Sequence, residues 1–384
     1  MMGARDERAS VRAGNGDSPR SSFRLGIAKG YCWMGFRWSL PGARSFWRAL
    51  RQYGKTFRRW TSSLRRWLSR RDHGSWSRRP PQIDGRGNPR NSKMVTRIRM
   101  SREQLRRGYE SLPPQVRTNA QTESLALGTA VVRGFLGADW LEKHVIPDSS
   151  KSGFFTIDES GPHRREMSFF RVIDLAEVLY NLQNIPGFDE CIQRMREGNI
   201  EGTFAELDFG RMLFLNAVPF RFVVPRGTTG ADYDIEVLYP NNVVACADAK
   251  CKIETTKFSE KSIRHTLNKA RKQLPNNEPG IVFVKVPAKW TVDPVLSRSA
   301  IDVARDFLRG TRRVVSVKFY GSPITYTDNV MKVQHAYKEI SNPVTDFGNG
   351  INWDIFKHVQ LPPEYNGMPL HWQRILFYPD GTAR

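Results

Sequence analysis

Three charged side chains at one end of a predicted hairpin are the residues best suited to chemistry. Asp234 opens an alternating strand pattern, and Asp248 and Lys250 end the apolar run that follows a Tyr-Pro-Asn-Asn turn. Residues two apart share one face of a strand, and a turn that pairs Tyr239 with Val243 places Asp234 opposite Asp248. Burying unpaired charge costs on the order of several kcal/mol. Two carboxylates and an ammonium at the end of a buried strand therefore favour a metal site over scaffolding.

The spacing of these residues resembles the signature of the PD-(D/E)xK nuclease superfamily, which has the restriction-endonuclease-like fold. In this chain the signature is Asp234 followed by Asp248-Ala249-Lys250. Asp232 is an alternative first aspartate, because it has the same strand parity as Asp234. The resemblance covers roughly residues 200–320. It implies metal-dependent phosphodiester hydrolysis, of DNA rather than RNA.

The elements around the hairpin are expected in the order of that superfamily, which is helix, three strands, helix, strand. Hydrophobic periodicity predicts an α/β protein with these elements beside the hairpin: a helix at 203–217, a strand at 220–224, a helix at 259–274, a strand at 281–286, a helix at 299–309 and a strand at 314–320. Glu206 on the first helix resembles a frequent extra acidic residue of the superfamily. The alternative is that Glu206 pairs with Arg211 or with a nearby lysine.

The resemblance implies a role for each of these residues. Asp234 and Asp248, or Asp232 in place of Asp234, would bind Mg²⁺ or Mn²⁺ through carboxylate oxygens, and Glu206 would complete the shell directly or through water. Lys250 would orient the attacking water or stabilise charge on the transition state. In the competing interpretation, Asp248 and Lys250 form a simple ion pair, and the first aspartate is an ordinary turn residue.

The helix expected at 259–274 is strongly basic. The residues expected to contact nucleic acid are Arg264, Lys269, Lys272 and Gln273. Lys269 and Gln273 are four apart and so share a face, and the alternative is a solvated helix face. A non-catalytic nucleic-acid-binding or scaffold protein on the same fold is the second function hypothesis, and an unrelated α/β interaction domain with a chance motif is the third.

Charge is concentrated in the first quarter of the chain. Residues 1–93 hold 22 Lys and Arg but 5 Asp and Glu, a net charge of +17 out of the +22 of the whole chain. Such a segment opposes a compact core, and six of the ten tryptophans lie in it. It is expected to be a disordered Arg- and Trp-rich leader or a spurious extension, with an ordinary sequence beginning near Met94. A nucleic-acid-binding arm and an organelle transit segment are the alternative interpretations.

The rest of the chain divides into three expected regions. Residues 94–200 are expected to form a helical region, 201–320 the nuclease-like core, and 321–384 an extension that wraps the core. The four cysteines lack zinc-type spacing and fit a reduced, cytoplasmic setting. No apolar run reaches the roughly 18–20 residues of a membrane span. The sequence leaves the oligomeric state open, a homodimer included.

Overall fold

The computed structural model describes residues 36–37, 99–117, 120–146, 153–158, 160–216, 218–224, 230, 232–239, 242–327, 330–333, 336–347 and 351–353. The expectations for residues 1–93 fall outside this part of the chain, apart from the two-residue strand β1 (Phe36–Arg37). The expectation that the tail wraps the core also falls largely outside it, because residues 354–384 are not described.

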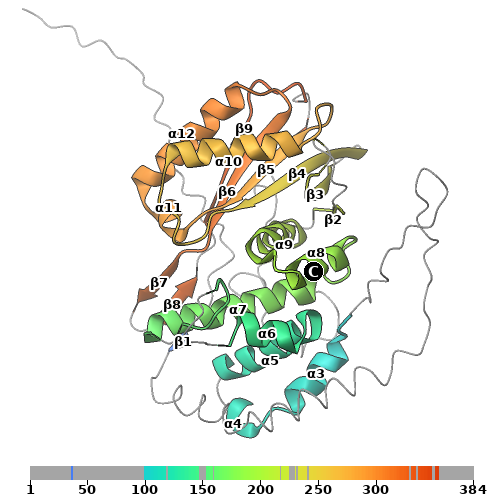
Figure 1. Cartoon of the computed structure of the whole chain (residues 1–384), viewed down its shortest axis with the longest axis vertical. Coiled ribbons are helices and arrows are strands. Elements are labelled where there is room, and N and C mark those ends of the chain that lie inside the picture. Colours follow the sequence, from blue (N-terminus) through green and yellow to red (C-terminus); the bar gives the residue numbers. More distant parts are fainter. Residues whose placement is uncertain are drawn as a thin grey trace, which may run out of the picture.

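An open mixed sheet of six strands, in the order β2-β3-β4-β5-β6-β9, runs through the upper part of the molecule (Figure 1). The first three strands are antiparallel neighbours, β4, β5 and β6 are parallel, and β9 returns antiparallel to β6. The strands are β2 (Phe220–Phe222), β3 (Ile235–Tyr239), β4 (Val243–Cys251), β5 (Gly280–Lys285), β6 (Val314–Gly321) and β9 (Ala336–Ser341). A second sheet has the order β1-β8-β7, with β7 (Ile324–Thr327) and β8 (Val330–Val333).

Helices cover both faces of the larger sheet (Figure 1). On one face lie α10 (Glu260–Gln273), α11 (Ala288–Val292) and α12 (Pro294–Arg309). On the other lies α9 (Ile200–Leu215), with a helical layer beyond it: α3 (Arg102–Glu110), α4 (Pro114–Arg117), α5 (Ala120–Leu136), α6 (Ala138–His144), α7 (Pro162–Leu182) and α8 (Phe188–Arg196). The described chain is thus a mixed α/β structure, as the periodicity predicted.

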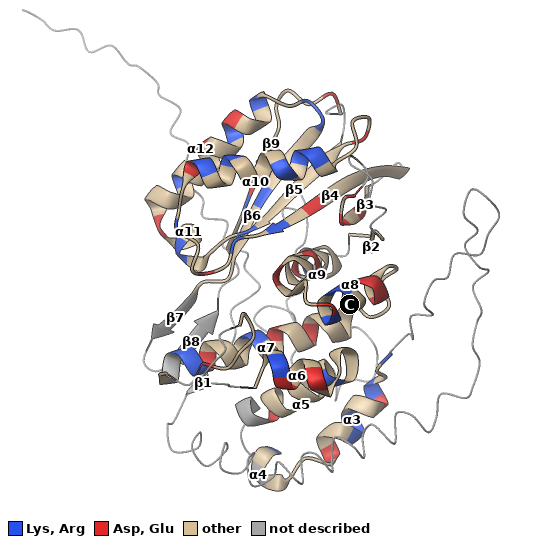
Figure 2. Ribbon diagram, in the orientation of Figure 1, with Lys and Arg blue, Asp and Glu red and all other residues tan. Residues whose placement is uncertain are grey.

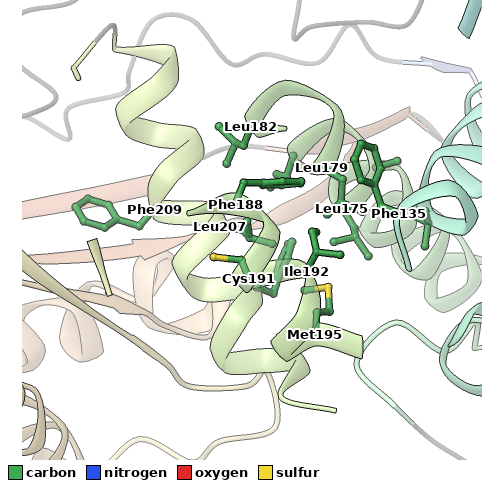
Figure 3. Packing of buried hydrophobic residues seen from close by; sticks show 14 of the residues in the cluster. Phe135, Leu175, Leu179, Leu182, Phe188, Cys191, Ile192, Met195, Leu207 and Phe209 are labelled. Atoms are coloured by element: carbon green, nitrogen blue, oxygen red, sulfur yellow. The ribbon is translucent and has the colours of Figure 1, made fainter. Parts of the chain in front are cut away.

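Two hydrophobic cores lie on the two faces of the sheet. Alternation along β4 sends Ala245 and Ala247 toward α9, and Cys246 toward α10. The larger core is continuous from the sheet through α9 into the helical layer, and its packing around α8 includes Phe188, Ile192 and Met195 (Figure 3). The helical region from residue 99 onward is therefore packed directly on the sheet by shared burial. Among the described helices, none combines the length and apolar character of a membrane span.

Most predicted elements from residue 200 to 321 occur in the predicted order, with shifted ends and an added helix α11. α12 starts before the predicted residue 299, because Asp293 caps it through the N–H groups of Val295 and Leu296. In the expected helical region, Gly137, with φ +100°, separates α5 from α6. The sixth strand β9 was not predicted.

A buried ion network joins the helical layer to the sheet. Arg211 on α9 donates to Asp174 of α7 and to Asp208, and Lys285 of β5 also donates to Asp208. The suggested pairing of Arg211 with Glu206 is therefore wrong. Positions 206 and 211 are five apart, so the two side chains leave α9 in different directions.

Candidate active site

The β3–β4 hairpin has the predicted register. Its ladder runs from Tyr239 opposite Val243 to Ile235 opposite Ala247, and there β3 begins. β4 continues to Cys251, paired on its other side by β5. The last residues of β4 therefore present an edge that no β3 residue of the ladder covers.

Asp234 fills the start of this open edge. Its backbone N–H donates to the Ala247 carbonyl oxygen at 2.9 Å, and its Oδ2 accepts from the Ala249 N–H at 2.7 Å. In an antiparallel ladder the N–H and C=O of one residue point to the same neighbour, so the Ala249 carbonyl also points to this edge. Asp234 thus places its carboxylate against Asp248-Ala249-Lys250.

Asp248 is fully buried beside Lys250. The Lys250 Nζ lies 2.6 Å from Asp248 Oδ2 and 3.4 Å from the Ala249 carbonyl oxygen. The predicted convergence of Asp234, Asp248 and Lys250 is therefore observed, and the ion pair of the competing interpretation is also present. Oδ2 of Asp248 is thus engaged by the Lys250 ammonium, whereas Oδ1 has no hydrogen-bond partner within the described structure.

Glu206 reaches the same cluster from α9. Its carboxylate accepts from the Arg194 guanidinium, which comes from α8. The charges of Asp234 and Asp248 raise the pKa of Glu206, and Lys250 lowers it, so these groups lie within electrostatic reach of one another. The four predicted catalytic residues thus belong to one cluster.

Burial dominates the protonation of these carboxyl groups. It raises the pKa of Asp248 and of Glu206 well above their ordinary values, with the carboxyl of Asp234 as the next cause for each. Burial also raises the pKa of Asp234, against the opposing charge of Lys250. These three carboxyls share the buried site with the Lys250 ammonium and the Arg194 guanidinium, and the charge of Lys269 also acts on Asp248.

The fit of the cluster to a divalent cation is partial. The carboxylates of Asp234 and Asp248 and the Ala249 carbonyl are hard oxygen donors of the kind that Mg²⁺ prefers. The Oδ1 atom of buried Asp248, which has no partner within the described structure, is consistent with such a ligand. In the described part of the chain, however, no three His, Cys, Asp or Glu side chains are arranged to hold a metal. The expected three-carboxylate shell is therefore not assembled, because Arg194 engages Glu206.

The basic helix α10 flanks the cluster (Figure 2). Lys269 is exposed on this helix, and its charge lowers the pKa of Asp248. Gln273 donates from Nε2 to the Asp232 carbonyl oxygen at 3.2 Å, and its Oε1 is buried without a described partner. Asp232 is therefore linked to α10 through its backbone carbonyl, which accepts the hydrogen bond from Gln273.

The other two basic residues proposed on α10 are placed differently. Arg264 turns toward α12, where its guanidinium lies 4.0 Å from Asp306. Lys272 is exposed near the end of the helix. The structure thus places Gln273 against the backbone beside the cluster, whereas Arg264, Lys269 and Lys272 are exposed on α10, and Lys269 acts on Asp248 through its charge.

Arg194 is the residue of the cluster that the sequence did not reveal. The amphipathic pattern of α8 places it beside buried Cys191. That pattern predicts a helix but does not show which helix or strand the arginine will meet.

Comparison of the chain with protein-family models, curated proteins and solved structures finds no match.

Proposed function

We propose that this protein is a metal-dependent nuclease of the PD-(D/E)xK type. The observation that carries the proposal is the Asp234 carboxylate bound to the Ala249 N–H, beside the buried pair Asp248–Lys250. The succession of α9, β2, β3, β4, α10 and β5 supports the same assignment. DNA is the preferred substrate in this proposal.

The chemistry follows from the positions of the side chains. Asp234 and Asp248 would hold Mg²⁺ or Mn²⁺, which supplies charge neutralisation at phosphorus and acidifies water. Lys250 holds its ammonium between Asp248 and the Ala249 carbonyl, where it can orient the attacking water or stabilise developing negative charge. Lys269 on α10 adds positive charge beside the carboxylates, which favours approach of a phosphate backbone.

A non-catalytic nucleic-acid-binding protein on the same fold is the second candidate. It is favoured by one observation, namely that Lys250 and Arg194 already neutralise Asp248 and Glu206. In that case the cluster is a closed ion-pair network, and α10 alone would contact nucleic acid.

A cleavage assay separates the two candidates. The full-length chain is incubated with supercoiled plasmid, linear duplex DNA and duplex RNA in Mg²⁺, in Mn²⁺ and in EDTA. We expect cleavage of DNA with either metal, none in EDTA, and none by Asp248→Asn. The matched control is Asp302→Asn on α12, which removes an exposed carboxylate that pairs with Arg305. Binding without cleavage under every metal condition contradicts the nuclease proposal and supports the second candidate.

A further inference from the structure

Arg194, the arginine that engages Glu206, lies on a helix whose start packs closely against strand β2. α8 begins after Gly187, where an added Cβ would stand 2.2 Å from the Phe222 carbonyl oxygen and where φ is +83°. No L side chain fits that contact. Arg194 lies two turns along this helix, and its side chain is 17% exposed. The guanidinium therefore approaches the cluster from a defined direction and retains access to solvent.

Arg194 is held loosely in comparison with a structural arginine of the same molecule. One nitrogen, Nη2, donates both to the Glu206 carboxylate and to Cys191 Sγ, the latter at 3.4 Å. Its Nε is buried and has no hydrogen-bond partner within the described structure. Arg211 has three partners: Asp174, Asp208 and Tyr320. A guanidinium bonded through one nitrogen lacks the two-pronged geometry that makes arginine–carboxylate pairs strong.

The charge of Arg194 reaches two members of the cluster. It lowers the pKa of both Glu206 and Asp234, so the guanidinium lies near both carboxyls. A divalent cation held by Asp234 and Asp248 would place two further positive charges in the same low-dielectric region. The resulting repulsion falls on Arg194, which is the more exposed and less bonded of the neighbouring arginines.

We propose that Arg194 is a positioning residue that withholds Glu206 from the site until a divalent cation binds. This inference rests on the proposed function and deepens it, because it makes a cation and an arginine compete for one carboxylate.

The competition predicts the direction of change in metal affinity. Arg194→Met removes the competitor, so the Kd for Mn²⁺ should fall about threefold to tenfold, at about 1.4 kcal/mol per tenfold. Arg194→Lys keeps the charge and should remain within about twofold of wild type. In a Glu206→Gln background the substitution Arg194→Met should have almost no effect, because the contested carboxylate is gone.

The experiment is a titration of the full-length chain with Mn²⁺, followed by electron paramagnetic resonance, without nucleic acid. Arg196→Met is the matched control, since Arg196 lies on the same helix and donates to the Phe135 carbonyl away from the cluster. If Arg194→Met fails to fold, Arg194→Gln, which also removes the positive charge, takes its place with the same expected fall in Kd. A melting temperature is measured for every variant.

The outcomes separate this inference from the proposed function. Tighter Mn²⁺ binding by Arg194→Met alone, cancelled by Glu206→Gln, supports it. Mn²⁺ binding that is unchanged or weaker in Arg194→Met overturns the inference and leaves the nuclease proposal standing. A wild-type chain that binds no Mn²⁺ overturns both.

Discussion

Replacing Asp248 by asparagine is expected to stabilise the metal-free protein at alkaline pH. The side chain is fully buried; its Oδ2 contacts the Lys250 ammonium at 2.6 Å, and its Oδ1 has no hydrogen-bond partner in the described structure. Lys250 attracts the charge and Asp234 repels it, so these two effects oppose one another. The free energy of the folded state is therefore raised mainly by the unsatisfied buried acceptor, which costs about 1–3 kcal/mol, or more when the group is charged. The amide keeps part of this cost, so we expect a gain of roughly 1–2 kcal/mol.

The gain should depend on pH in a defined direction. Burial raises the pKa of Asp248 in the folded state, so the folded protein holds a proton that the unfolded chain releases. This contribution to stability is complete at low pH and is lost as pH rises through the folded pKa. Wild type and Asp248→Asn should therefore have similar stability near pH 5 and diverge toward pH 8.

Calorimetry in EDTA and in Mg²⁺ provides the assay. For a folded region of this size, roughly 1–2 kcal/mol corresponds to a rise in Tm of about 3–6 °C. Saturating Mg²⁺ should raise the Tm of wild type and leave Asp248→Asn unchanged, because ligand binding to the folded state alone stabilises it. A variant that is destabilised at pH 8, or one that Mg²⁺ stabilises as much as wild type, would refute the reasoning.

Three further outcomes follow from other residues. Lys250→Ala should lower turnover by about 100-fold or more with little change in DNA affinity, and a parallel collapse of affinity would make Lys250 a phosphate clamp instead. Lys269→Gln should reduce the slope of log K against log salt by about 0.9, whereas Arg264→Gln, whose charge is already near Asp306, should change it less; equal slopes for the two variants would contradict the placement of Lys269. Burial raises the pKa of Glu123 to about 7, so its stabilising contribution is complete at low pH and is lost as pH rises past 7. Glu123→Gln should therefore raise the Tm at pH 8.5 and leave it nearly unchanged at pH 5, and a larger effect at pH 5 would contradict this.

The hairpin could be predicted because its determinants are local. The alternation before the turn and the apolar run after it define the pairing of Tyr239 with Val243, and that pairing locates Asp248 and Lys250. Parity could not separate Asp232 from Asp234. The choice is made by the way Asp234 bonds both to the Ala247 carbonyl and to the Ala249 N–H, which only the folded backbone shows.

The remaining features of the site depend on tertiary packing. The pair Arg194–Glu206 joins two helices whose packing is set partly by the close contact of Gly187 with Phe222. The periodicity of the sequence does not predict the contact between Gly187 and Phe222. The strand β9 pairs with β6 at the sheet edge, and Ala336–Ser341 lacks the apolar alternation that indicates a half-buried strand. Prediction succeeded where turn and pattern coincide and failed where distant segments meet.

The most direct test of the central claim is anomalous diffraction from crystals of the full-length protein grown with Mn²⁺. We predict a peak between the carboxylates of Asp234 and Asp248, beside the Ala249 carbonyl. The same crystals of Asp248→Asn should lack that peak. A wild-type structure at saturating Mn²⁺, with Lys250 still paired to Asp248 and no peak at this edge of β4, would contradict the assignment of the cluster as a metal-dependent active site.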